Sequence, residues 1–262
     1  MTDISMTLRQ EINRCYDVFG KCLRPTQPLN ACTCPMCLDP KLEQEMKTLP
    51  LAQITAKHFY RYNSSPLNKV QNANEIKYFL PRMIELFVQG EYLHHSTELY
   101  FERVGNCPAD SFSPKEQAVW QQFADAYLDE MLKVYCWEYS TIYKWHSSIF
   151  DVLLMFYKGN IDIQPFLQRW RNTQTPQAIV NYIHESYWDF WCDGGYKNPF
   201  ADDLPKFREV MDDWLNDESN KGYFIEQILN LDSQVIEEFY AWNGRYGLVE
   251  NLFDLMTYDL TD

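Results

Sequence analysis

Three cysteines near the start of the sequence have a spacing that suits metal binding. They lie in the motif Cys32-Thr33-Cys34-Pro35-Met36-Cys37. A turn that contains proline can bring three thiolates onto one zinc ion, which prefers four ligands in a tetrahedron. A fourth ligand must then come from Cys22, Cys15 or His58. The sequence therefore predicts a candidate site for one structural zinc ion, formed by Cys32, Cys34 and Cys37 with Cys22 or His58.

Two other interpretations of these cysteines stay open. Cys34 and Cys37 form a C-x-x-C pair, which is typical of redox proteins, but no strand precedes them as in a thioredoxin-like unit. No second C-x-x-C pair with the spacing of a zinc motif follows. The same residues are also consistent with a compact turn that is packed by small thiols and holds no metal.

A second candidate for metal chemistry is the acidic run that begins at Asp212 and Asp213. It superficially resembles the aspartate-rich helix of isoprenoid synthases, where carboxylates hold magnesium and a diphosphate. Such an enzyme needs a second magnesium motif on another helix, and the sequence contains none. Asp202 and Asp203 precede a proline, as acids at a helix start do. A solvated acidic helix face is the favoured interpretation.

Other catalytic signatures are missing from the sequence. It has no G-x-S-x-G, no phosphate-binding glycine loop, no dinucleotide fingerprint and no zinc-protease H-E-x-x-H. We therefore expect a protein that is not an enzyme. The alternatives are a metal-dependent all-α enzyme that uses the Asp212 region, a thiol enzyme that uses the cysteines, and a zinc-containing adaptor.

The net charge of −14 is concentrated near the C-terminal end. Residues 201–262 contain 15 acids and 4 bases, which gives −11. A strong acidic field repels nucleic acid and anionic membranes and attracts basic proteins. Aromatic residues, 16% of the chain, supply anchors for a protein partner. The predicted partner-binding residues are Asp202, Asp203, Asp212, Asp213, Asp217, Glu218, Trp242 and Tyr246.

The elements that must position these residues are helices. Apolar residues recur at helical spacing along most of the chain, and period-two alternation is almost absent. We expect an all-α fold, either a multi-helix bundle or an irregular α-solenoid-like array, with a Cys/Pro-rich loop over 22–39. It forms one domain, 1–262, with a candidate subdomain boundary near 193–204. The expected helices cover 4–19, 39–47, 74–89 with a kink or break at Pro81, 96–104, 113–135, 141–157, 163–171, 175–190, 205–215, 223–229, 233–242 and 248–257.

The first residues have no basic region followed by an apolar stretch, so they do not resemble a secretion signal. No apolar run reaches the length of a membrane span. These features predict a cytoplasmic protein with no membrane partner. In a reducing compartment, its eight cysteines are expected to be thiols or metal ligands rather than disulfides.

The N-terminal third resembles a family of bacterial proteins that share the pattern CxCPxC … TPLxxI … YFLPRxxELxxxG. The matching residues run from Cys32 to Pro40, continue with Leu49-Pro50-Leu51 and Ile54, and end with Tyr78-Phe79-Leu80-Pro81-Arg82, Glu85-Leu86 and Gly90. The resemblance covers about residues 30–92. Some members lie beside Rhs-type polymorphic toxins, which implies an immunity role, and the family supplies no catalytic residues.

The charge and the resemblance together predict an immunity protein. It would bind a cognate secreted toxin of the Rhs or type VI kind and occlude the toxin's active site through an acidic, aromatic-rich surface. Toxins that act on RNA, DNA or nucleotides tend to have basic clefts, which such a surface complements. The predicted partner is therefore a toxin domain, not nucleic acid, and the predicted cofactor is none or one structural zinc ion.

Overall fold

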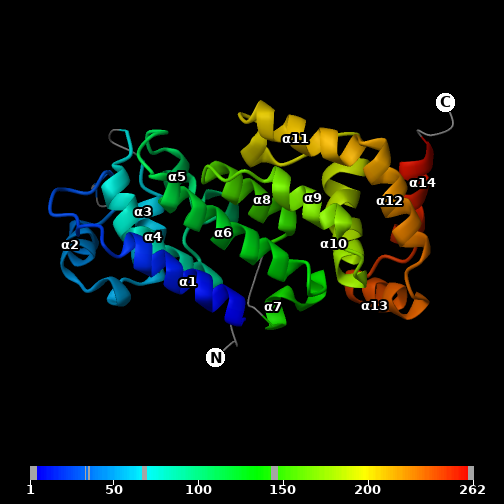
Figure 1. Ribbon diagram of the computed structural model, residues 1–262, viewed down its shortest axis with the longest axis horizontal. Coiled ribbons are helices and arrows are strands. Elements are labelled where there is room, and N and C mark those ends of the chain that lie inside the picture. Colours follow the sequence, from blue (N-terminus) through cyan, green and yellow to red (C-terminus); the bar gives the residue numbers. More distant parts are fainter. Residues whose placement is uncertain (1–4, 33, 35, 67–69, 143–146, 259–262) are drawn as a thin grey trace. The chain divides into compact units, whose positions relative to one another are not determined.

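The computed structural model describes residues 5–32, 34, 36–66, 70–142 and 147–258 (Figure 1). Every regular element within these ranges is helical, and the described residues contain no strand. The predicted all-α, multi-helix fold is therefore confirmed. Within the same ranges, no helix combines the length and the apolar character needed to cross a membrane.

The chain divides into two compact units. Unit 1 comprises residues 1–127, 142–147 and 151–162, and unit 2 comprises 128–141, 148–150 and 163–262. The candidate subdomain boundary near 193–204 lies inside unit 2, so the observed division falls elsewhere. Because the chain passes between the units more than once, a boundary of this kind leaves no single linker in the sequence.

The helices of unit 1 begin and end close to their local signals. Asp39 caps the helix that starts at Pro40, and the side chains of Ser113 and Glu116 form a capping box at the start of the expected helix 113–135. Its elements are α1 (Met6–Phe19), α2 (Pro40–Thr48), η1 (Leu51–Gln53), α3 (Ala56–Asn63), α4 (Ala73–Val88), η2 (Thr97–Leu99), α5 (Glu102–Gly105), most of α6 (Pro114–Met131) and most of α8 (Ile149–Lys158).

The core of unit 1 is built from aromatic rings. Leu8, Ile12, Cys15 and Phe19 form the buried stripe of α1, which packs along α4. Rings from α4, α6 and α8 meet with the ring that precedes α5, at centroid distances of 4.4–6.2 Å: Phe87, Phe101, Trp120, Phe123, Tyr127 and Phe156. Packed aromatic rings bury large areas, so they stabilise unit 1 although several of its helices are short.

Three expectations about helices need correction. Of the kink or break expected at Pro81, the break is absent, because Pro81 lies inside one helix, α4. The expected helix over 141–157 is replaced by α7 (Tyr139–Ile142) and α8, and residues 143–146 between them lie outside the described residues. The expected helix over 96–104 is η2 and α5, separated by Tyr100 and Phe101.

Unit 2 contains the acidic C-terminal helices. Its elements are η3 (Cys136–Glu138), α7, α9 (Gln164–Asn172), α10 (Pro176–Ser186), η4 (Tyr187–Trp191), η5 (Pro199–Ala201), α11 (Pro205–Asn216), α12 (Glu218–Leu229), α13 (Ser233–Asn243) and α14 (Leu248–Tyr258). Its core centres on Tyr182, which stacks on Phe224 at 3.6 Å and lies against Trp170 and Trp214. Trp214 is therefore mainly a core residue rather than a surface anchor.

Candidate functional site

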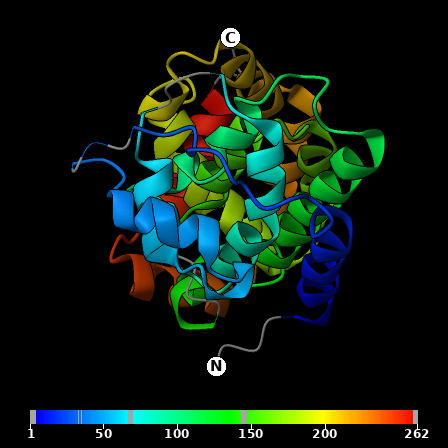
Figure 2. The same cartoon turned by 90° about the vertical axis from the view of Figure 1, so that its left-hand side faces the viewer.

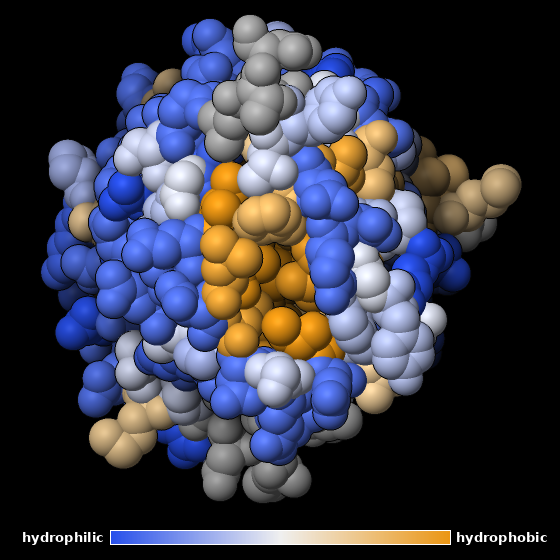
Figure 3. All heavy atoms as spheres, turned by 90° about the vertical axis from the view of Figure 1, so that its right-hand side faces the viewer, coloured by the Kyte–Doolittle hydropathy of each residue, from blue (hydrophilic) through white to orange (hydrophobic). Residues whose placement is uncertain are grey.

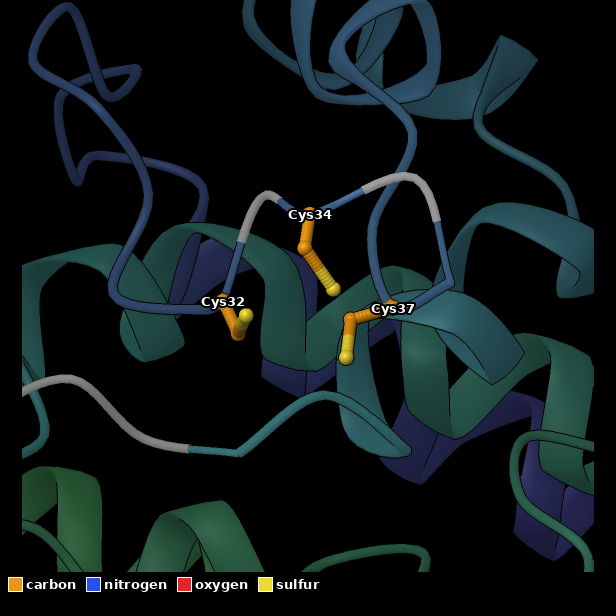
Figure 4. Close-up of side chains that lie close together, drawn as sticks. All are labelled: Cys32, Cys34 and Cys37. Carbon is orange, nitrogen blue, oxygen red and sulfur yellow. The ribbon is translucent and has the colours of Figure 1, made fainter.

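The three cysteines of the predicted metal site lie together in the loop between α1 and α2. Their Sγ atoms are all within 4.8 Å of one another, and Figure 4 shows the three side chains converging beneath the loop. The backbone N–H of Cys37 donates to the carbonyl of Cys34 at 3.0 Å, and that of Leu38 donates to the carbonyl of Cys32 at 3.1 Å. These bonds close a turn, so the thiols face each other. We call Cys32, Cys34 and Cys37 the thiol trio.

A buried network anchors the chain that leads into the thiol trio. Figure 2 shows the segment between α1 and α2 crossing unit 1 as an irregular loop. The guanidinium of Arg103 donates to the carbonyl of Asn30 at 2.9 Å and to that of Tyr62 at 2.6 Å. The backbone N–H of Asn30 donates to the carboxylate of Glu75 at 3.1 Å. Because Asn30 stands two residues before Cys32, these bonds fix the start of the turn. Nothing in the sequence pattern marks Arg103 or Glu75 for this role.

The thiols of the trio differ in acidity. Hydrogen bonds from the side chains of Cys37 and Cys32, and from the backbone N–H groups of Cys37 and Met36, lower the pKa of Cys34. The hydrogen bond to Cys34 is the main cause that raises the pKa of Cys37 to about 11. Cys34 therefore loses its proton more readily than Cys37, and a thiolate is the form that binds metal ions.

The geometry of the trio fits a thiophilic metal ion. Zinc–sulfur bonds of about 2.3 Å in a tetrahedron place the sulfur atoms about 3.8 Å apart. The separations within the trio, all at most 4.8 Å, need only small side-chain rotations to reach that value. The trio thus offers three ligand atoms to a metal ion that prefers four ligands.

His58 does not lie with the trio. It is buried on α3, where its Nδ1 contacts the hydroxyl of Thr55 at 2.8 Å and its Nε2 contacts the carboxylate of Glu45 at 3.1 Å. Both ring nitrogens therefore have partners already. His58 therefore connects α3 to α2 through its contact with Glu45.

The other two cysteines proposed as a fourth ligand also lie elsewhere. Burial and the carboxylate of Glu116 raise the pKa of Cys22, while the ammonium of Lys77 lowers it, which places Cys22 beside the Lys77–Glu116 ion pair. Cys15 is fully buried on α1, and burial raises its pKa to about 12. The fourth position of the trio is therefore open among the described residues.

A polar pocket adjoins the trio. Its lining residues are Cys37, Asp39, Lys41, Leu42, Glu45, Lys57 and Arg61. Cys34 itself is exposed to solvent. A ligand from outside the chain, such as water, can therefore reach a metal ion held by the three thiols.

Three of the six predicted partner-binding acids have structural contacts. The carboxylate of Asp212 accepts the backbone N–H of Tyr196 at 2.8 Å. Asp217 is the N-cap of α12, where its side chain accepts a backbone N–H at 2.9 Å. Glu218 pairs with the buried ammonium of Lys221 at 2.5 Å. The capping role of Asp217 could have been predicted from the sequence, since an Asp before a helix is a common N-cap.

The other three predicted acids lie on the surface of unit 2. Asp203 and Asp213 are exposed, and Asp213 lines a shallow polar pocket with Arg171. Asp202 approaches Arg208 only at 4.0 Å, with both side chains largely in solvent. An exposed pair of this kind contributes little to stability, so these carboxylates remain available to a partner.

The two predicted aromatic anchors are exposed. The exposed fraction is 45% for Trp242 and 81% for Tyr246. Trp242 rests against Trp137, at 6.0 Å between ring centroids, and Tyr246 rests against Tyr240 at 5.6 Å. Figure 1 shows α11 and α13 on opposite sides of unit 2, so the acids of α11 and these aromatics form two separate groups.

No carboxylate site accompanies the Asp212 run. Within the described part of the chain, the thiol trio is the one group of three or more His, Cys, Asp or Glu side chains close enough to hold a metal ion. The resemblance to an aspartate-rich magnesium helix therefore gains no support from the geometry.

The chain was compared with known proteins and structures. No protein-family model matches it, no curated protein matches its sequence, and no solved structure matches its fold.

Proposed function

We propose that this protein is an immunity protein, which binds a cognate secreted antibacterial toxin of the Rhs or type VI kind and occludes the toxin's active site. The proposal joins the family resemblance of residues 30–92 to one observation on unit 2. That observation is an acidic surface which the chain itself does not neutralise.

Residues 201–258 contain 13 acids and only 4 bases. In this range, the ion pairs formed by described residues join Asp202 to Arg208 and Glu218 to Lys221. A fold that needed these carboxylates for its own stability would pair them more often. Unpaired acids of one sign create a field that attracts a basic protein and speeds its encounter.

The binding mechanism follows from this field. A toxin that acts on RNA, DNA or nucleotides binds an anionic substrate, so its cleft is basic. Carboxylates such as Asp203 and Asp213 would steer the cleft toward unit 2, and exposed aromatics such as Trp242 and Tyr246 would supply the desolvated contacts that slow dissociation. Occlusion needs no catalytic residue, and immunity to a toxin that acts inside the cell places the protein in the cytoplasm.

We further propose that the thiol trio holds one structural zinc ion, with its fourth ligand from outside the described residues. The ion would clamp the loop between α1 and α2, since metal binding to a site that is absent from the unfolded chain adds to the folding free energy. A zinc-containing adaptor with no toxin partner is the second candidate function, and the convergence of the three thiols is the observation that favours it.

A co-expression experiment tests the immunity proposal. The toxin domain encoded beside this protein would be expressed in a bacterial host with and without it, and the two proteins would then be purified together. Restored growth with a stable complex is the expected result. Growth without a complex would assign enzymatic reversal of the damage instead, and no restored growth would overturn the immunity role in favour of the adaptor.

A matched pair of variants tests the acidic surface in the same assay. Asp203→Lys with Asp213→Lys reverses two exposed acids of unit 2, whereas Asp17→Lys with Asp110→Lys reverses two exposed acids of unit 1. We expect the first pair alone to weaken protection and complex formation. Equal effects of the two pairs would show that only total charge matters.

A further inference from the structure

An apolar hollow lies on the C-terminal part of unit 2. Figure 3 shows a depression lined by hydrophobic residues and bordered by hydrophilic ones on the face that α12, α13 and α14 form. Apolar side chains on these helices that keep partial or full exposure are Ile225, Leu229, Val235, Ile236, Phe253 and Leu255. The apolar patches that monomers leave exposed are often functional.

The exposed face of α12 provides one side of this apolar surface. Gly222, Ile225 and Leu229 follow one another at helical spacing, and Leu229 is 67% exposed. A Cβ added at Gly222 would meet no atom within 4 Å. Glycine within a helix costs about 0.5–1 kcal/mol relative to alanine. Here the missing side chain leaves the helix backbone open to close approach from outside.

Helix α14 also contributes an exposed apolar side chain to this surface. It packs against α12 and η4 through Leu248, Leu252 and Met256, which are buried. Leu255 lies one turn from Leu252, at the edge of that buried stripe, and is 38% exposed. The apolar surface therefore continues from the core of unit 2 outward, rather than consisting of isolated surface residues.

The charges around the hollow are acidic. The exposed acids of α12 to α14 and their connections are Glu218, Glu226, Asp232, Glu237, Glu238, Glu250 and Asp254. Residues 218–258 contain two bases, and both are engaged. Lys221 is buried and paired with Glu218 at 2.5 Å, and the guanidinium of Arg245 lies over the ring of Trp188 at 4.3 Å. No free base among these residues offsets the acids.

We infer that the hollow binds an amphipathic helix of the partner protein, with its apolar face in the hollow and basic residues on its flanks. This inference rests on the proposed function and names the part of the partner that this site recognises. A helix lays apolar residues into a hydrophobic groove at spacings of three and four, and lysines or arginines beside that face would meet the bordering acids. A second copy of this chain is the wrong occupant, because it would bring like charge against like charge.

A peptide experiment tests the hollow without the partner. The probe is a labelled helical peptide of about 18 residues with leucines at positions i, i+3, i+4 and i+7 and lysines on its flanks. Wild-type protein should bind it at a ratio of one to one, more weakly as salt is added. The same peptide with glutamates in place of the lysines should not bind.

Matched variants decide between the hollow and general charge attraction. Leu229→Gln and Leu255→Gln remove exposed apolar groups from α12 and α14 and keep the net charge. Leu23→Gln removes an exposed leucine from unit 1. We expect the first two to weaken peptide binding by about tenfold or more each, and the third to leave it unchanged. Equal binding by all three variants, or a wild-type dimer that the Leu229 variant converts to a monomer, would overturn the inference.

The co-expression assay separates this inference from the proposed function. If wild-type protein protects against the toxin and the Leu229→Gln variant protects equally well, the hollow is not the toxin site although the immunity role stands. If wild-type protein fails to protect but still binds the basic peptide with the expected variant pattern, the hollow stands as a helix-binding site and the immunity role falls.

Discussion

The guanidinium of Arg103 lies over the ring of Tyr62, with its central carbon 4.1 Å from the ring centroid. The hydroxyl of Tyr62 in turn donates to the carboxylate of Glu75. All three residues are buried. The opposite charges of Arg103 and Glu75 thus share one network, which reaches Asn30 and through it the loop of the thiol trio.

Replacing Arg103 by methionine should lower the free energy of unfolding by about 3–5 kcal/mol, because the buried carboxylate of Glu75 loses the opposite charge in its network. Urea unfolding measures the change. Lys41→Met is the control, since the Lys41–Glu45 pair is long, at 3.9 Å, and exposed. It should cost less than about 1 kcal/mol. Similar losses in both variants would show that Arg103 has no special role.

The purified protein should contain one zinc ion per chain, measured by elemental analysis. Cys34→Ser and Cys37→Ser should release the ion and lower the melting temperature, because each removes a thiolate ligand. Cys192→Ser, which alters an exposed cysteine outside the trio, should retain both metal and stability. Wild-type protein without metal after expression in zinc-rich medium would leave the trio as a packed turn.

The free energy of unfolding should fall as the pH is lowered from about 6.5 to 4. Burial lowers the pKa of His184 to about 4, and burial with the neighbouring His95 lowers that of His94 to about 4. In this window the unfolded chain binds protons at both residues and the folded chain does not, so acid favours unfolding. Burial also raises the pKa of Asp189 to about 6, which acts in the opposite direction.

The test of this pH dependence is His184→Gln. The variant should show a shallower loss of unfolding free energy between pH 6.5 and 4 than the wild type, because one of the two histidines with a lowered pKa is removed. Parallel curves for variant and wild type would mean that His184 does not contribute.

Charge reversal at Asp203 and Asp213 should slow association with the toxin, and the effect should be largest at low ionic strength. Stopped-flow fluorescence over a range of salt concentrations measures it. Asp212→Asn serves as a contrast. It removes a charged acceptor from the backbone N–H of Tyr196, so it should lower stability rather than the association rate. Unchanged kinetics after reversal would rule out electrostatic steering by these two acids.

Gly105→Ala should destabilise unit 1 by about 1–3 kcal/mol. A Cβ at Gly105 would lie 1.8 Å from the carbonyl oxygen of Lys158, so α5 and α8 would have to move apart. Gly222→Ala is the opposite case, because a Cβ there meets open space. It should stabilise α12 by about 0.5–1 kcal/mol, and thermal unfolding compares the two variants. A Gly105→Ala variant as stable as the wild type would contradict the close approach of Gly105 to the backbone of Lys158.

Features that depend on neighbours in the sequence could be predicted. The caps at Asp39, Ser113 and Thr175 fix helix starts within a few residues, and the structure has all three. The trio was predictable for the same reason, since three thiols within six residues cannot lie far apart. Its fourth ligand was not, because the position of His58 depends on Thr55 and Glu45 around it.

Other features of the fold have no local signal in the sequence, or their signal was interpreted wrongly. The helix α3 was not predicted, and α12 begins at Glu218 rather than near 223, because Asp217 was interpreted as a surface acid and not as a cap. The network of Arg103 and Glu75 joins segments that meet only after folding. The apolar hollow likewise depends on how α12 and α14 pack, and helical periodicity gives each helix only its own apolar face.

The open hollow on α12 to α14 also bears on how the protein behaves when no partner is present. Exposed apolar surface promotes aggregation, and charged residues around it act as gatekeepers that keep identical chains apart. The carboxylates that attract a partner are thus also the ones that keep the unbound protein in solution.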